Sequence, residues 1–162
     1  ATSQYECGYS EKIPLATRLE VVSYSPDPQF RVMGGKAIGK NVISPDGSEI
    51  RNNTLIRVDE ELLPKSRMGK IAKSLGMVDT RFGKGYFITT LDDLSKLGYA
   101  LMNEGIYGGE VCIDGRNMET LRGKMISLYG EESTRYIFET NVGTLVMMMN
   151  SLQKDIVFAI TK

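Results

Sequence analysis

The sequence predicts a single α+β domain, built from one mostly antiparallel sheet and about three amphipathic helices. Short apolar runs bounded by turn residues fill both ends of the chain, and three segments with helical spacing of apolar residues lie between them. Because the strands precede and follow the helices instead of alternating with them, we expect antiparallel pairing. The length of 162 residues fits one globular domain, 1–162, with a core of its own.

The first half of the chain is expected to form strands. A weakly alternating segment, 17–24, ends at two closely spaced prolines, and a second strand runs over 29–33, up to a pair of glycines. The segments 42–43 and 48–50 are typical of two strands joined by a Ser-Pro-Asp-Gly turn. A further short strand is expected over 54–58.

Three helices are expected in the middle of the chain. The first has Pro64 in its first turn and ends at Gly76. The second begins at Thr90, whose hydroxyl should accept a hydrogen bond from the backbone amide of Asp93, and ends at Gly105. The third is expected over 117–129. The residues expected to be buried are Met68, Ile71, Ala72 and Leu75 in the first helix, Leu94, Leu97 and Leu101 in the second, and Met118, Leu121, Met125 and Leu128 in the third.

Three strands should close the fold as an antiparallel meander. They are expected over 135–140, 144–150 and 156–161. The middle strand contains three successive methionines, 147–149. Methionines in such a strand fit a soft apolar core, or an apolar edge that a second copy of the chain covers.

The composition removes several classes of chemistry. The sequence has no histidine, and its two cysteines, Cys7 and Cys112, stand far apart. The commonest general base at neutral pH, the commonest metal ligand and the Ser/His and Cys/His nucleophile pairs are therefore missing. We expect free thiols, no metal and no cofactor.

Neither a membrane span nor a signal peptide is expected. No apolar run approaches the roughly 20 residues that a membrane span requires. The first residues also lack a basic patch followed by an apolar stretch. The sequence therefore predicts a soluble, cytoplasmic protein with no membrane partner.

Charge is distributed unevenly, although the net charge is zero. Between Arg51 and Lys84, eight basic residues stand against four acidic ones, a local balance of +4. Several of these cations share the first predicted helix, which would give it a positive face. The candidate residues for binding an anion or nucleic acid are Lys65, Arg67, Lys70, Lys73, Arg81 and Lys84. We therefore expect a binding or assembly domain, without a catalytic centre of its own, that engages nucleic acid or another polyanion.

Two other functions are open. A hydrolase that uses carboxylates or a Ser/Lys pair would need such groups buried together in a cleft. The groups available for it are Glu60, Asp92, Asp93, Glu131 and Lys154. A self-associating structural subunit would instead use the methionine-rich strand, and the chain would then be a homo-oligomer. Aromatic residues near Arg122 and Arg135 fit either a stacking platform for single-stranded nucleic acid or a core, and they are Tyr129, Tyr136 and Phe138.

Parts of the chain resemble the serine β-lactamase and penicillin-binding family. The stretches are 75–82 (Leu-Gly-Met-Val-Asp-Thr-Arg-Phe), 89–98 followed by 102–105 (Met-Asn-Glu-Gly), and the closing hairpin over 145–160. The resemblance implies a reduced β-lactamase-like hydrolase as one form of the hydrolase alternative. That family's nucleophile lies in a Ser-x-x-Lys motif at the start of a buried helix. The only such spacing here, 151–154, falls in a predicted turn, and the family's Lys-Thr-Gly motif is absent, so no catalytic residue is carried over.

Overall fold

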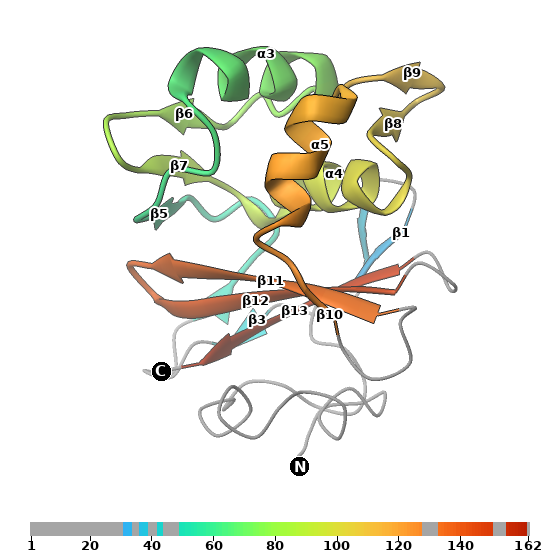
Figure 1. Ribbon diagram of the computed structural model, residues 1–162. Helices are drawn as coiled ribbons and strands as arrows, with labels where there is room; N and C mark the ends of the chain where they lie inside the picture. Colours follow the sequence, from blue (N-terminus) through green and yellow to red (C-terminus); the bar gives the residue numbers. More distant parts are fainter. Residues whose placement is uncertain are drawn as a thin grey trace.

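The computed structural model describes residues 31–33, 36–38, 42–43, 49–127, 133–150 and 155–161. Within this part of the chain the fold is α+β, as predicted, with three helices on one side of a nine-stranded sheet (Figure 1). All the strand pairs described are antiparallel. The predicted strand over 17–24 lies outside the described residues.

The sheet runs in the order β2-β1-β13-β12-β11-β5-β7-β6, and β10 pairs with β11 beside this path. Its strands are β1 (Arg31–Met33), β2 (Lys36–Ile38), β5 (Ile56–Val58), β6 (Arg81–Phe82), β7 (Phe87–Thr89), β10 (Ile126–Ser127), β11 (Ser133–Thr140), β12 (Gly143–Asn150) and β13 (Asp155–Thr161). Two small hairpins lie apart from it, β3 (Val42–Ile43) with β4 (Glu49–Ile50), and β8 (Ile106–Tyr107) with β9 (Glu110–Val111).

The predicted closing meander is present as β11, β12 and β13. Strand β12 pairs with β11 over its whole length, from Thr140↔Gly143 to Ser133↔Asn150, and with β13 on its other side. The methionines at 147–149 are buried on this interior strand. They therefore lie on an interior strand and not at the expected methionine-rich edge, and self-association stays a prediction.

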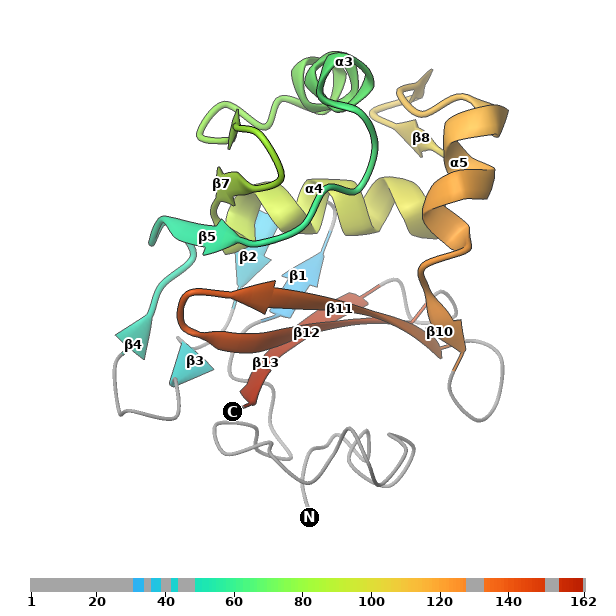
Figure 2. The same ribbon diagram turned by 60° about the vertical axis from the view of Figure 1, so that its left-hand side comes forward.

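Helix α4 (Leu91–Met102) packs directly on the meander, between the sheet and α3, as Figure 2 shows. Its Gly98 makes the close approach possible. A Cβ atom built on Gly98 would lie 2.8 Å from Cδ1 of Ile156 and 3.0 Å from Sδ of Met147. The core that forms between the helices and this face of the sheet includes Leu94, Leu97, Leu101, Phe138, Leu145 and Phe158.

The start of α4 confirms the predicted cap. Thr90 has an extended backbone, and its side-chain oxygen accepts a hydrogen bond from the backbone amide of Asp93 at 3.0 Å. The end of α4 differs from the prediction, because the helix stops at Met102 with Asn103 as its C-cap. Glu104 and Gly105 then both take positive φ angles, 58° and 85°, and turn the chain into β8.

Helix α3 (Lys65–Leu75) ends at the predicted Gly76, but Pro64 is its N-cap and does not belong to its first turn as predicted. Gly76 ends it with a φ of 73°, a left-handed conformation that glycine adopts without the penalty of a Cβ atom. The four residues predicted to be buried in it, Met68, Ile71, Ala72 and Leu75, are all buried.

Helix α5 spans Gly115–Arg122, so the predicted bounds of 117–129 are wrong. The Asp114 carboxylate caps its start by accepting a hydrogen bond from the backbone amide of Asn117 at 2.9 Å. The chain leaves the helix at Gly123, because pairing of β10 with β11 outweighs continued helix. Met118 and Leu121 are buried as predicted, Met125 is half-buried after the helix, and Leu128 lies outside the described residues.

Candidate functional site

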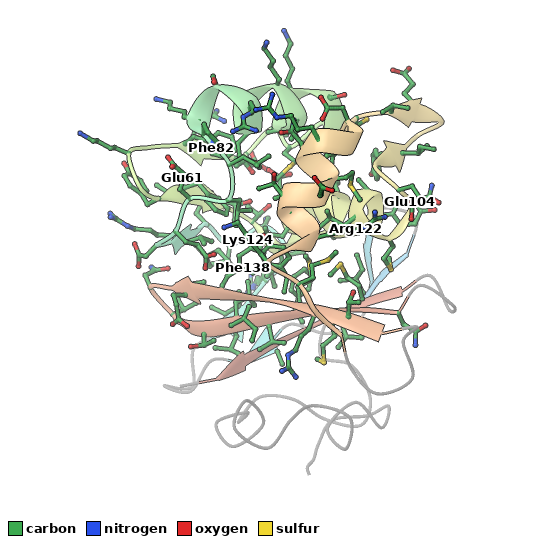
Figure 3. All side chains as sticks on the ribbon, in the orientation of Figure 1. Glu61, Phe82, Glu104, Arg122, Lys124 and Phe138 are labelled. Atoms are coloured by element: carbon green, nitrogen blue, oxygen red, sulfur yellow. The ribbon has the colours of Figure 1, made fainter. Side chains whose placement is uncertain are left out.

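Helix α3 presents its cations to solvent on the face opposite the core. Lys65, Lys70 and Lys73 are exposed and Arg67 is half-buried. Figure 3 shows nitrogen-tipped side chains that project from this helix away from the rest of the molecule. Within the described residues, no carboxylate forms an ion pair with any of the three lysines. These charges are therefore solvated and available to a partner.

A groove of about 460 Å³ lies between α3 and β6. We call it the α3–β6 groove, and it is lined by Lys65, Gly69, Ala72, Lys73, Gly76, Met77, Val78, Thr80, Arg81 and Phe82. Lys65 and Lys73 stand on its helix side about two turns apart, and Arg81 stands on its strand side. None of the described residues that line the groove carries a carboxylate. The groove thus combines an apolar floor with three positive charges.

Hydrogen bonds fix the strand side of this groove. The Arg81 guanidinium donates to the carbonyl oxygens of Val78 and Thr80, both at 2.9 Å, which holds the charge close to its own turn. The Lys96 ammonium donates to the carbonyl oxygen of Gly76 at 2.7 Å. Behind them, the carboxylate of the buried Asp93 accepts the Thr80 hydroxyl at 2.7 Å. The turn after α3 is therefore tied to α4, and the groove is preformed.

A second groove, of about 370 Å³, lies on the opposite side of α3. We call it the α3–α5 groove, and it is lined by Arg67, Lys70, Ile71, Ser74, Val111, Cys112, Asp114 and Asn117. The Arg67 guanidinium donates to Oδ1 of Asn117 at 3.1 Å, which joins the two helices. The thiol of Cys112 lies 3.6 Å from the carbonyl oxygen of Ser74.

The structure therefore divides the six predicted binding residues. Lys65, Lys73 and Arg81 surround the α3–β6 groove, whereas Arg67 and Lys70 line the α3–α5 groove. Lys84 is exposed in the turn between β6 and β7 and lines neither groove.

The aromatic platform considered for nucleic acid is not an exposed surface. Tyr136 and Phe138 are buried, and their rings stack on each other with centroids 4.8 Å apart. Tyr129 lies outside the described residues. Phe82, which is half-buried and lines the α3–β6 groove, was not selected from the sequence, although its position directly after Arg81 in the basic segment is a signal that could have found it.

The groups considered for a hydrolase are not brought together in one cleft. Asp93 is buried behind the α3–β6 groove, where it accepts the hydrogen bond from Thr80. Its neighbour Asp92 is half-buried at the start of α4. Glu60 lies at another place, where one of its carboxylate oxygens accepts the backbone amide of Glu139 at 3.1 Å. Glu131 and Lys154 lie outside the described residues. Among the described residues, no group of three or more Cys, Asp or Glu is placed to hold a metal ion.

Glu60 and Tyr136 have shifted pKa values because of burial. Desolvation raises the pKa of the half-buried Glu60, against the opposing effects of the Glu139 amide and the Lys124 charge. Burial also raises the pKa of Tyr136, and the negative charge of Glu60 adds to that rise. The Tyr136 hydroxyl is buried without a hydrogen-bond partner among the described residues. Neither group lines the two grooves beside α3, so these shifts do not mark a site there.

Comparison of the chain with protein-family models, with curated proteins and with solved structures gave no match. The function must therefore be argued from the geometry of the two grooves. Within the described residues, no helix has the length and apolar character that crossing a membrane demands.

Proposed function

We propose that this protein is a binding domain that engages an anionic partner through the α3–β6 groove. The observation that carries the proposal is that Lys65, Lys73 and Arg81 line one groove, to which the described residues contribute no carboxylate. Cations placed in this way raise the local concentration of an anionic ligand and speed its association. They give the domain a positive site in spite of its zero net charge.

Single-stranded nucleic acid is the partner class that best fits both the cations and the apolar floor of the groove. Phosphates would contact the lysines, and a base would lie on the apolar floor beside Met77 and Phe82. Base stacking on aromatic side chains contributes about 1–3 kcal/mol per base and tolerates any sequence. A duplex keeps its bases inside, so it would contact the cations but leave the apolar floor unused.

The test is the binding of a fluorescent single-stranded oligonucleotide, measured by anisotropy at several salt concentrations. The variants Lys65→Gln and Lys73→Gln should each weaken binding, and each lost phosphate contact should reduce the slope of log K against log salt by about 0.7. Phe82→Ala should also weaken binding, with little change in the salt slope.

Lys124→Gln is the matched control. It removes one exposed lysine that follows α5 and lies outside both grooves (Figure 3), so binding should stay unchanged. Lack of binding by the unmodified protein at low salt would refute the proposal. Equal effects of Lys73→Gln and Lys124→Gln would refute the assignment to this groove. Tighter binding of an acidic peptide than of the oligonucleotide would make a protein the partner.

We also propose the β-lactamase and penicillin-binding resemblance as a relationship of fold. Its support is that Asp93, in the second resembling stretch, accepts hydrogen bonds from Asp79 and Thr80 in the first, and that α4 lies on the closing strands. The test of activity is the intact mass of the full chain after incubation with a penicillin. A covalent adduct would favour the hydrolase over the binding domain, and an unchanged mass would favour the binding domain.

A further inference from the structure

Asn117 is a buried polar residue with unused hydrogen-bonding capacity. Only 9% of the residue is exposed, and it lines the α3–α5 groove. Because the Arg67 guanidinium donates to Oδ1, the amide orientation is fixed and the amino group Nδ2 is left over. No described residue accepts a hydrogen bond from Nδ2. Nδ2 is therefore a free donor on the wall of the groove, where a ligand or water can accept its hydrogen bonds.

Three further donors line the same groove. They are the remaining N–H groups of Arg67, the ammonium of Lys70 and the hydroxyl of Ser74. Together with Nδ2 of Asn117 they make a set of donors from two helices. The charges of the lining residues are two positive, on Arg67 and Lys70, and one negative, on Asp114. Such a set suits an acceptor that carries negative charge.

We propose that the α3–α5 groove is a binding site for the phosphate group of a small molecule, separate from the α3–β6 groove. A phosphate monoester carries a charge of about −1.5 to −2 and three strong acceptor oxygens, so it suits two cations and four donor side chains better than a singly charged carboxylate does. The site uses different residues from the proposed nucleic-acid site and does not depend on it.

The rest of the groove indicates what carries the phosphate. A volume of about 370 Å³ leaves room for a small organic body beside the phosphate. Asp114 lies at the start of α5, where one of its oxygens already accepts the Asn117 amide. The other oxygen can accept hydrogen bonds from hydroxyl groups, and its charge disfavours a second anionic group there. The site therefore suits a phosphate monoester with hydroxyls, such as a polyol phosphate.

The experiment is calorimetric titration of the full chain with glycerol phosphate and, separately, with inorganic phosphate. Asn117→Asp is the decisive variant, because it keeps the oxygen that accepts the Arg67 hydrogen bond and replaces the free donor with a negative charge. We expect it to weaken phosphate binding at least tenfold. Asn141→Asp is its control, since Asn141 likewise uses its Oδ1 as an acceptor, from the Arg57 amide at 2.9 Å, but lies in the turn between β11 and β12.

Lys70 and Lys73 separate this proposal from the proposed function. Both are exposed lysines of α3, but they line different grooves. Lys70→Gln should weaken glycerol phosphate binding and leave the oligonucleotide largely unaffected, whereas Lys73→Gln should do the opposite. Tighter binding of glycerol phosphate than of inorganic phosphate would support a monoester ligand, and the reverse order would support free phosphate in the same site.

Two results would overturn the site. One is the absence of saturable binding of either phosphate compound to the unmodified protein. The other is equal binding by the Asn117→Asp and Asn141→Asp variants. Neither result would affect oligonucleotide binding that depends on Lys73, so the two proposals fail independently.

Discussion

The hydroxyl of Thr80 donates a hydrogen bond of 2.7 Å to the buried carboxylate of Asp93, thirteen residues further along the chain. The same carboxylate oxygen accepts the backbone amide of Asp79 at 3.0 Å, and Lys96 lies 3.5 Å from the other oxygen. Asp93 thus connects the turn that floors the α3–β6 groove to the first turn of α4. The Thr80–Asp93 hydrogen bond therefore both positions the α3–β6 groove and stabilises the fold.

Replacement of Asp93 by alanine should destabilise the protein strongly. It removes the acceptor of the buried Thr80 hydroxyl and of the part-buried Asp79 amide, and a buried donor left unpaired costs about 1–3 kcal/mol. Urea unfolding followed by circular dichroism measures the loss. Asp92→Ala, at the adjacent half-buried position, should cost less than about 1 kcal/mol, because it removes only a favourable interaction with the helix dipole. Equal losses for both variants would contradict the role given to Asp93.

Thr90→Ala should lower the free energy of unfolding by roughly 0.5–2 kcal/mol, because the Asp93 amide loses its cap. Thr90→Ser keeps the oxygen and should retain most of the stability. The same unfolding measurement compares the two variants, and binding to the grooves beside α3 should be unchanged in both. A serine variant as unstable as the alanine variant would show that the cap is not the cause.

Tyr136→Phe should not destabilise the protein, although Tyr136 is among its largest buried side chains. The change removes a buried hydroxyl that has no partner among the described residues and keeps the stacked ring. Relief of an unpaired polar group is worth about 1–3 kcal/mol, so we expect a higher unfolding midpoint. A marked loss of stability in thermal unfolding would reveal a hydrogen bond that this hydroxyl makes.

Glu60→Gln should stabilise the protein at neutral pH. Burial raises the pKa of Glu60 above its ordinary value of 4.5, so the native state binds this proton more tightly than the unfolded state does. Its contribution to stability is therefore present below pH 4.5 and is lost as pH rises through the folded-state pKa. The gain from glutamine should appear above that pKa and vanish at acidic pH. Glu61→Gln, at an exposed position, should change the free energy of unfolding little.

Two helical glycines should respond in opposite ways to a side chain. Gly69 on α3 has no neighbouring atom within 4 Å of a built Cβ, so Gly69→Ala should raise stability by about 0.5–1 kcal/mol. Gly98 on α4 lies against Ile156 and Met147, so Gly98→Leu should overpack the core and lower the free energy of unfolding by about 1–3 kcal/mol. Differential scanning calorimetry compares both variants with the unmodified chain.

The sequence predicted the elements whose signals are local. Helix α3 has a stop glycine and regular apolar spacing, and α4 has a cap that needs only Thr90 and Asp93. Strand β7 was missed, because the three residues Phe87–Thr89 are too few to show an alternating apolar pattern. This strand forms because it pairs with β5 and β6. Helix α5 was overextended, because apolar spacing continues past Gly123 while the chain turns away to pair with β11.

The candidate sites were only partly predictable. The sequence identified the cations of α3, and their spacing on a helix already places Lys65 and Lys73 on a different side from Arg67. Arg81 lies beside Lys65 and Lys73 because the turn after α3 packs against that helix. Asn117 lies beside Arg67 and Lys70 because helix α5 packs against the other side of α3. Such contacts between distant segments have no signature in residue spacing.

Strand β5 meets β11 at a single register pair, Thr140↔Val58, and backbone bonds from Asp59 and Asn141 extend this junction. By contrast, β11, β12 and β13 pair along their lengths with strands adjacent in the sequence. Closing the short loops of the meander costs less entropy than joining β5 across more than eighty residues. We therefore expect the meander to form early in folding, and the β5-β7-β6 side, which carries one wall of the α3–β6 groove, to dock late and to open first in hydrogen exchange.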